Sequence, residues 1–256
     1  MSTTPPLLAA YDIDKRYGHV EALRGAGFTV DAGEVVALIG DNGAGKSTLT
    51  KVLSGAIRPD GGRIELAGER IDLHSPLDAQ RYGIETVYQD LALAYDLDAA
   101  ANLHLGREVF RAAPLRWFGV LDKPAMRQNA EAAFRDLKIT LPDVTVPVGT
   151  LSGGQRQCVA VARAVAFATK VVFMDEPTAA LGVVQRGQVL DLIRRIRDQG
   201  VAVVLISHNM PEVLAVADRV EVLRLGRRVA RLTTETTSIE ELVSAMTGGL
   251  NTEEGA

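Results

Sequence analysis

One segment near the start of the chain combines closely spaced glycines with a lysine and a serine, residue types that could bind phosphate. Residues 40–47 read Gly-Asp-Asn-Gly-Ala-Gly-Lys-Ser and follow the apolar run Val35–Ile39. Glycines let the backbone wrap closely, so that successive N–H groups point at phosphate oxygens, and a helix beginning at Lys46 adds its positive N-terminal end. Lys46 can then reach the β and γ phosphates, while Ser47 offers a hydroxyl to Mg²⁺. We predict a nucleotide-binding loop formed by Gly40, Asp41, Asn42, Gly43, Ala44, Gly45, Lys46, Ser47 and Thr48.

Two carboxylates follow another apolar run. Asp175 and Glu176 come directly after residues 171–174, as expected at the carboxyl end of a buried parallel strand, where the ligands of such sheets collect. An Asp-Glu pair at this place is often only the end of a strand, but beside a phosphate-binding loop it becomes specific. We predict that Asp175 holds Mg²⁺ through its water shell and that Glu176 orients or deprotonates the attacking water.

His208 ends a third apolar run, residues 201–207. A lone histidine at such a place is more often a hydrogen-bonded structural residue than a functional one. Its position beside the same sheet edge, together with the motif described next, favours a contact with the γ-phosphate.

A second candidate anion site lies far along the chain, at residues 151–157, which read Leu-Ser-Gly-Gly-Gln-Arg-Gln. Ser152 is a good N-cap for a following helix, and Gly153 and Gly154 leave backbone N–H groups accessible. One nucleotide does not need two such sites from one chain. We therefore expect a symmetric dimer in which Ser152, Gly153, Gly154 and Gln155 of each chain close over the phosphates bound by the other.

A mostly parallel sheet must position these groups, and the pattern of the chain predicts one. The continuous apolar run Val35–Ile39 is typical of a strand buried on both faces, and glycine-rich turns punctuate short β-type runs around it. Between Gln89 and Leu151, helix-like patterning interrupted by prolines indicates an inserted helical lobe. Ser238-Ile-Glu-Glu241 has the spacing of a capping box that begins a last short helix. We predict an α/β fold: a P-loop NTPase core over residues 7–232 with an N-terminal antiparallel β subdomain and a helical subdomain inserted at about 90–165, followed by a short helix and a frayed tail over 233–256.

Composition narrows the classes of function. The 256 residues carry 28 lysines and arginines against 32 aspartates and glutamates, a formal net charge of −4, which argues against a dedicated nucleic-acid binder. The single cysteine, Cys158, excludes an internal disulfide and fits a reducing compartment. No apolar run is long enough to cross a bilayer, and the first residues lack the features of a secretory signal, so we expect a cytoplasmic protein. Cys158 is expected to pack in the helix that follows Ser152, and Trp117 in the helical lobe.

In their order along the chain, these motifs resemble the ATP-binding cassette family, the nucleotide-binding subunits of ABC transporters. The matching segments are residues 40–47, Gln89, residues 151–155, residues 171–176 and His208. Tyr17, in Lys15-Arg-Tyr-Gly18, stands where the family places an aromatic residue that stacks on adenine. The resemblance covers about residues 7–230 and implies that ATP and Mg²⁺ are the ligands.

The resemblance also implies roles for individual residues. Gln89 would contact Mg²⁺ or the attacking water and sense the membrane partner, and Glu176 would be the catalytic carboxylate. Ser152 and Gly154 would touch the γ-phosphate of the ATP bound by the other chain. The helical lobe would supply the groove in which a coupling helix of a transmembrane permease docks. One position departs from the family: Gly182 stands where an aspartate usually helps the two sites of a dimer communicate.

Four segments point to one kind of transporter. They are similar to the ATPases of monosaccharide importers of the ribose, xylose and fructose type: residues 40–45, residues 151–157, residues 175–182 (Asp-Glu-Pro-Thr-Ala-Ala-Leu-Gly) and residues 206–211 (Ile-Ser-His-Asn-Met-Pro). We expect an ATP-hydrolysing import subunit that forms an ATP-dependent homodimer on the cytoplasmic face of the membrane, with separate permease subunits and a solute-binding protein. The alternatives are the ATPase of another solute importer, such as one for amino acids, or a regulatory or repair ATPase. The net charge and the short insertion disfavour the last.

Overall fold

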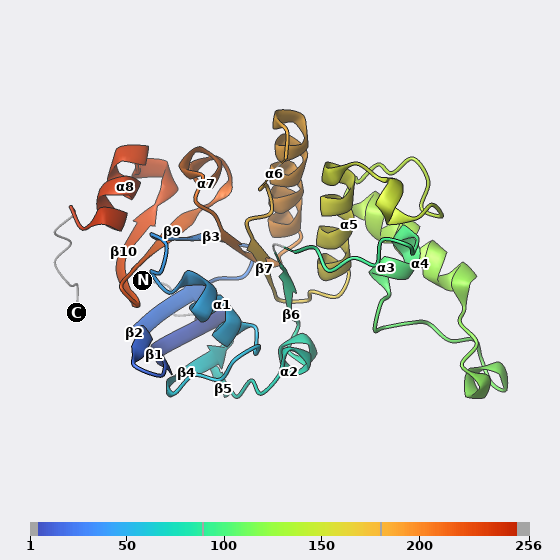
Figure 1. Cartoon of the computed structure of the whole chain (residues 1–256), viewed down its shortest axis with the longest axis horizontal. Coiled ribbons are helices and arrows are strands. Elements are labelled where there is room, and N and C mark those ends of the chain that lie inside the picture. Colours follow the sequence, from blue (N-terminus) through green and yellow to red (C-terminus); the bar gives the residue numbers. More distant parts are fainter. Residues whose placement is uncertain (1–4, 89, 180, 250–256) are drawn as a thin grey trace.

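The structure is a computed structural model and describes residues 5–88, 90–179 and 181–249 of the chain. It contains two β-sheets, helices that cover the larger sheet, and a lobe of helices at one end (Figure 1). The strands are β1 (Leu8–Tyr17), β2 (Val20–Val30), β3 (Val35–Ile39), β4 (Gly61–Leu66), β5 (Glu69–Ile71), β6 (Ile84–Val87), β7 (Val171–Asp175), β8 (Ala202–Ile206), β9 (Arg219–Arg224) and β10 (Arg227–Thr233). The helices are α1 (Lys46–Leu53), α2 (Pro76–Arg81), α3 (Ala99–Leu103), α4 (Lys123–Asp136), α5 (Gly153–Val165), α6 (Val183–Asp198), α7 (Met210–Val216) and α8 (Ile239–Thr247), with 3₁₀ helices η1 (Leu115–Phe118), η2 (Val148–Thr150) and η3 (Thr234–Thr236).

The larger sheet brings the ends of three predicted strands together. Its order is β10-β9-β3-β8-β7-β6, and its neighbouring strands are parallel except for β9 and β10. Every residue of β3 and of β8 is buried, as their continuous apolar runs predicted, because both faces of this sheet are covered. Leu38 lies in register with Ile206, and Met174 with Leu205. The carboxyl ends of β3, β7 and β8 therefore meet at one edge of the sheet.

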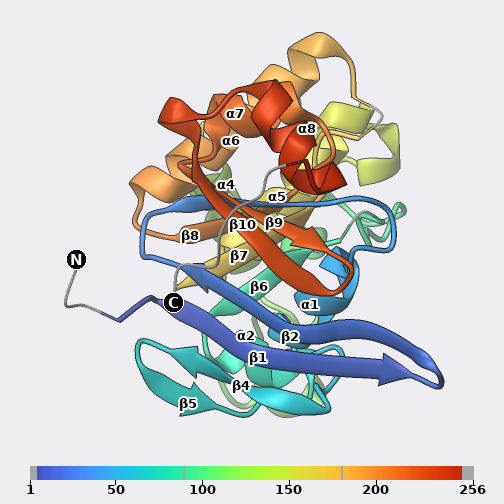
Figure 2. The same cartoon turned by 90° about the vertical axis from the view of Figure 1, so that its left-hand side faces the viewer.

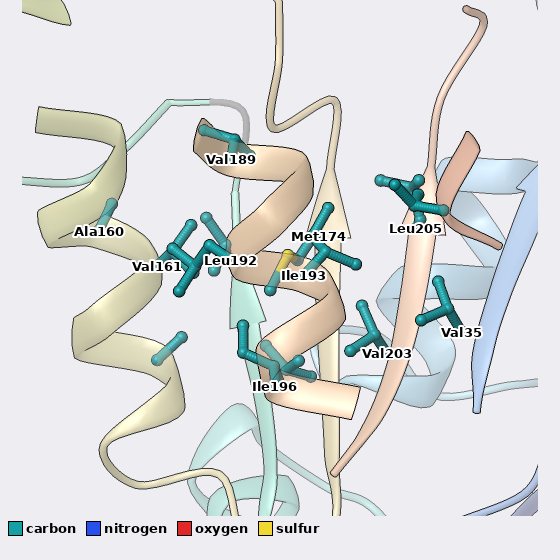
Figure 3. Packing of buried hydrophobic residues seen from close by; sticks show 14 of the residues in the cluster. Val35, Ala160, Val161, Met174, Val189, Leu192, Ile193, Ile196, Val203 and Leu205 are labelled. Atoms are coloured by element: carbon teal, nitrogen blue, oxygen red, sulfur yellow. The ribbon is translucent and has the colours of Figure 1, made fainter. Parts of the chain in front are cut away.

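Alternate residues of β3 face two different cores, because successive side chains of a strand point to opposite faces. Val36 and Leu38 pack in a cluster with α1 and with the antiparallel sheet, whose order is β2-β1-β4-β5. Val35 faces the other cluster, where Leu192 of α6 and Leu205 of β8 pack (Figure 3). Figure 2 shows the antiparallel sheet on one side of the larger sheet and α6, α7 and α8 on the other. The expected α/β class, with its antiparallel N-terminal sheet, is confirmed.

The helical lobe is formed by α3, α4 and α5, on the right of Figure 1. Asn102 of α3 is fully buried, and its amide makes hydrogen bonds of 2.8–3.1 Å with backbone groups of residues 94–98. Arg163 of α5 donates to the carbonyls of Leu91 and Ala92, at 2.9 and 2.7 Å. These two side chains fasten the segment that follows residue 89 to the lobe. The proposed limits of the subdomain, about 90–165, stay a prediction.

The structure also tests the expectations for Cys158, Ser238 and Trp117. Cys158 is buried in α5, and Ser238 forms the predicted capping box with Glu241 at the start of α8. The expectation that Trp117 packs in the helical lobe is wrong, because this residue lies in η1 and is 82% exposed. Its loop continues beyond the body of the lobe (Figure 1), which agrees with the high exposure of this residue. None of the helices in the described part of the chain is long and apolar enough to cross a membrane.

Candidate nucleotide-binding site

The predicted phosphate-binding loop connects β3 to α1 and is held by close backbone contacts. Gly40 has a φ of +151°, and a Cβ there would lie 2.2 Å from the carbonyl oxygen of Leu223. Gly45, with a φ of +104°, would place a Cβ 2.7 Å from the carbonyl oxygen of Ala22. Only glycine fits these two positions, because the loop is pressed between β2 and the end of β9. The tertiary packing therefore fixes the shape that the glycine spacing predicted.

The residues of this loop differ in their exposure, and only the exposed ones are accessible to a ligand. Asp41, Asn42 and Gly43 are exposed at its tip, and Ser47 is exposed in the first turn of α1. Ala44 is buried, and its N–H donates to the carbonyl of Asp41 at 3.1 Å. Thr48 is half-buried on the same helix. The loop as a whole, rather than each side chain, forms the predicted phosphate site.

Lys46 lies folded back on the loop. Its Nζ donates to the carbonyl oxygens of Gly40 at 2.6 Å and Asp41 at 3.0 Å. Burial lowers the pKa of Lys46, while the charges of Glu176, Asp41 and Asp175 act in the opposite direction. The ammonium group and the two carboxylates at the carboxyl end of β7 thus share one site, as the ends of parallel strands predicted.

Asp175 and Glu176 stand at the carboxyl end of β7. Burial raises the pKa of Asp175, and the adjacent charge of Glu176 raises it further, whereas Lys46 lowers it. Glu176 has a φ of +48°, a conformation that is strained for a residue with a side chain, and its N–H donates to the carbonyl of Ile206 at 2.9 Å. The strand β8 therefore holds the backbone of Glu176 in this turn.

The carboxylate of Glu176 meets His208. Oε1 of Glu176 lies 2.8 Å from Nδ1 of the imidazole, and the side chains are 27% and 73% exposed, respectively. A carboxylate at Nδ1 fixes the orientation of the ring and leaves its other nitrogen available to a ligand. The structure thus brings together the lysine, the two carboxylates and the histidine that were predicted from separate parts of the sequence.

The donors present fit a magnesium ion held mainly by its nucleotide. Mg²⁺ in phosphate sites uses one or two protein carboxylates, phosphate oxygens and water. Here Asp175 ends β7, and Ser47 directly follows Lys46, whose charge acts on Asp175. No group of three or more histidine, cysteine, aspartate or glutamate side chains suited to a metal occurs among the described residues. An all-protein metal cage is therefore not the arrangement seen in this part of the chain. Gln89, also predicted as a ligand, lies outside the described residues.

The second predicted anion site begins α5. Ser152 and Gln155 form a reciprocal capping box, in which Oε1 of Gln155 accepts from the N–H of Ser152 at 2.9 Å. Gly154 faces α6: a Cβ there would lie 2.5 Å from Cγ of Gln185. No hydrogen bond or ion pair within the described ranges joins residues 152–155 to Lys46, and Figure 1 shows α5 and α1 on opposite sides of α6 and β7. One chain therefore does not bring the two anion sites together, and the contact in trans stays a prediction.

Tyr17 lies at the end of β1, where it pairs with Val20 across the hairpin. The residue is 48% exposed, and Nζ of Lys15 lies 5.9 Å from the centroid of its ring. The next strand, β2, reaches the phosphate loop at Ala22, which contacts Gly45. Tyr17 thus lies on the hairpin whose second strand contacts the loop, and its role as an adenine platform stays a prediction.

Sequence reasoning missed one buried carboxylate that links the segments of Glu176 and His208. Glu212 of α7 accepts hydrogen bonds from the hydroxyl of Thr178 and, at 2.8 Å, from Nδ2 of Asn209, the N-cap of α7. Nη1 of Arg186 lies 3.8 Å from the same carboxylate. Thr178 follows Glu176 by two residues and Asn209 follows His208, so Glu212 joins the two segments from behind. The Asn-x-x-Glu spacing signalled a helix start but not the contact with Thr178.

Comparison with known proteins agrees with this fold. A protein-family model described as ABC transporter matches residues 23–179. The fold of this chain resembles the solved structure of an ATP-binding cassette of an ABC transporter in its ADP conformation, with a TM-score of 0.78. The two sequences are 27% identical, and the match covers 95% of this chain and 96% of that one. These findings define a nucleotide-binding α/β ATPase domain.

Curated relatives place the chain more closely. It is 50% identical to the fructose import ATP-binding protein FrcA of Rhizobium meliloti, over 95% of this chain and 94% of that protein. It is 45% identical to the xylose/arabinose import ATP-binding protein XylG of Sulfolobus acidocaldarius, over 94% of each. A ribose import ATP-binding protein of Rubrobacter xylanophilus is 43% identical, and the chain spans 47% of its length. The chain belongs to the ATP-binding subunits of the ABC transporter family.

Proposed function

We propose that this protein hydrolyses ATP to drive the import of a monosaccharide through a separate membrane permease. The chemistry is carried by one observation, the convergence of Lys46, Asp175 and the Glu176–His208 pair at one edge of the sheet. The substrate class is supported by the relatives, which are named for fructose, xylose or arabinose, and ribose import and match this chain at 43–50% identity.

The residues around the loop divide the chemistry among themselves. The N–H groups of the loop and Lys46, released from the carbonyls of Gly40 and Asp41, would bind the phosphates. Ser47 and Asp175 would hold Mg²⁺, together with Gln89, and the ion neutralises phosphate charge when bound. Glu176 would accept the proton of the attacking water or orient that water.

A Glu176→Gln variant tests the assignment of the catalytic carboxylate. It keeps the size and one acceptor of the side chain but removes the base, so it should bind ATP normally while hydrolysis falls by about 100-fold or more. Glu240→Gln, an exposed carboxylate at the start of α8, is the matched control and should retain full turnover. Near-normal hydrolysis by Glu176→Gln would refute the role proposed for this residue.

The second anion site supports a homodimer that closes on ATP. Because α5 begins away from α1 in the same chain, the N-terminus of α5 remains free to cover the phosphates of a second copy. ATP should therefore convert Glu176→Gln from monomer to dimer, measured by light scattering after size-exclusion chromatography. Replacing the exposed Gly153, where a Cβ would lie 4.0 Å from Leu181, with arginine should abolish that dimer while ATP still binds. A stable dimer without nucleotide would contradict the proposal.

A groove in the helical lobe suits a coupling helix of the permease. It encloses about 370 Å³ and is lined by both apolar and charged side chains, including Leu97, Ala101, Glu108, Leu121 and Met126. Filling it with Ala101→Trp should uncouple sugar uptake without removing ATP hydrolysis by the isolated subunit. Retained uptake in reconstituted vesicles would place the permease contact elsewhere.

The identity of the transported solute can be tested with the solute-binding protein and with uptake by whole cells. The cognate solute-binding protein should bind a monosaccharide, and cells without this ATPase should lose uptake of that labelled sugar. Wild-type protein should restore uptake, and Glu176→Gln should not. A binding protein specific for an amino acid would replace sugar import with the alternative solute class while leaving the ATPase assignment intact.

A further inference from the structure

A hairpin in the helical lobe carries its apolar side chains outward. We name residues 109–121 the aromatic tip. It is closed by backbone hydrogen bonds from Arg111 to Val120 at 3.0 Å and from Asp122 to Val109 at 2.7 Å, and η1 lies at its end. Figure 1 shows this segment projecting from the lower right of the lobe. The aromatic tip is thus an ordered projection of defined secondary structure.

Exposure of large apolar groups is concentrated here. Trp117 and Phe118 are 82% and 79% exposed, and they adjoin Leu115, Val120 and Phe110, which are each about two-fifths exposed. Contiguous exposed apolar groups of this kind mark interaction surfaces.

The charge of the aromatic tip has one sign. Arg111 and Arg116 are exposed, and no aspartate or glutamate occurs between Glu108 and Asp122. Within the described ranges neither arginine takes part in a salt bridge, although the chain as a whole has a net charge of −4. Local positive charge beside aromatic rings complements an anionic surface with an apolar interior.

The base of the projection is fixed to the core. Nη2 of Arg107 lies 2.5 Å from Oε1 of Glu85, a side chain that is only 7% exposed and belongs to β6. The guanidinium carbon of Arg107 also lies 4.3 Å from the ring centroid of Phe167. Leu121, at the other end of the tip, lines the groove proposed for the permease. The tip therefore extends from the wall of that groove on a rigid support.

We infer that the aromatic tip binds the anionic lipid surface of the membrane beside the permease. Trp117 and Phe118 insert at the level of the lipid headgroups, where aromatic rings are favoured, and Arg111 and Arg116 contact the lipid phosphates. This inference rests on the proposed transport function, which requires the subunit to work at a membrane. It assigns to the subunit a direct lipid contact in addition to its permease contact.

The single tryptophan makes the inference directly measurable. The chain contains one Trp, so its fluorescence reports on Trp117 alone. Full-length protein should show a blue shift and sediment with vesicles of phosphatidylglycerol and phosphatidylethanolamine, but not with vesicles of phosphatidylcholine only. Arg111→Gln and Arg116→Gln should each lower vesicle affinity about fivefold. The control variants Arg70→Gln and Arg81→Gln, exposed arginines far from the tip in sequence, should bind as wild type.

Three results would overturn the inference. The first is an unshifted Trp117 emission with anionic vesicles, and the second is an equal loss of vesicle affinity in the control variants. The third is an emission shift seen only when the vesicles contain the permease, which would show that the aromatic tip contacts the permease and not the lipid. Phe118→Ala supplies a second test, because it should weaken vesicle binding yet keep nucleotide binding, which shows that the variant folds. ATP hydrolysis is measured separately without lipid, so failure of lipid binding is distinguishable from failure of the proposed ATPase function.

Discussion

Replacing Glu212 should change both the free energy of unfolding and the rate of ATP hydrolysis. Its buried carboxylate accepts a hydrogen bond from Thr178 and another from Asn209, and hydrogen bonds to charged groups contribute about 1.5–3 kcal/mol each. Glu212→Ala removes both and leaves the buried hydroxyl of Thr178 without its acceptor. Because Asn209 is partly exposed, we expect a net loss of about 3 kcal/mol in the free energy of unfolding. For a chain of this size that lowers Tm by about 6–12 °C.

The same change should act on turnover through position. Asn209 follows His208, and Thr178 lies two residues after Glu176, so loosening Glu212 frees both ends of the Glu176–His208 pair. We expect kcat to fall about tenfold while KM for ATP changes little, because the phosphate loop itself is untouched. Glu212→Gln keeps a side-chain oxygen for Thr178 and should recover most of kcat. Recovery by the amide would separate positioning from a need for charge.

A matched control lies at the start of α8. Glu241 occupies the same third helical position after its N-cap, but its side chain is exposed, and its only hydrogen bond to another described residue belongs to the capping box. Glu241→Ala should lower the free energy of unfolding by about 1 kcal/mol and leave turnover unchanged. Thermal unfolding and steady-state ATPase assays of the three variants test the reasoning. If Glu212→Ala is no more destabilising than Glu241→Ala, the buried network does not hold the two segments together.

Three further predictions concern the phosphate loop, the carboxylate of Asp175 and the ion pair of Arg107 with Glu85. Gly40→Ala should destabilise the fold more than Gly43→Ala, measured by chemical unfolding, because both have positive φ but only the first meets a backbone carbonyl; equal effects would refute the packing argument. Asp175→Asn should raise Tm at pH 7 while lowering Mg²⁺-dependent turnover, since burial and a neighbouring carboxylate raise the pKa of Asp175 and its folded form disfavours the charge. That gain in Tm should shrink as the pH falls towards the ordinary carboxyl pKa of 3.8, because the native aspartate is then protonated and its penalty disappears; a pH-independent gain would contradict it. Arg107→Ala should destabilise by about 3–5 kcal/mol because it strands the buried carboxylate of Glu85, and adding Glu85→Gln should restore much of the loss in a double-mutant cycle.

Much of the fold was predictable because local patterns carried strong physical constraints. The uninterrupted apolar run Val35–Ile39 predicted a strand buried on both faces, and the structure buries all five residues. The Ser238–Glu241 spacing predicted a helix start that forms as expected. The prediction for Trp117 was wrong because an apolar side chain is buried only where a neighbouring element covers it, and Trp117 is 82% exposed. Aromatic type alone cannot distinguish a core residue from an exposed contact residue.

The site divides in the same way between what the sequence determined and what the tertiary structure decided. Residue type and spacing determined the phosphate loop, the carboxylate pair and the helix cap at Ser152, because glycine freedom, strand ends and capping act over a few neighbouring residues. Only the tertiary structure decided that His208 meets Glu176 and that Glu212 joins the segments behind them. These contacts join residues more than 30 positions apart, and they depend on the register of β7 with β8, which no local pattern specifies.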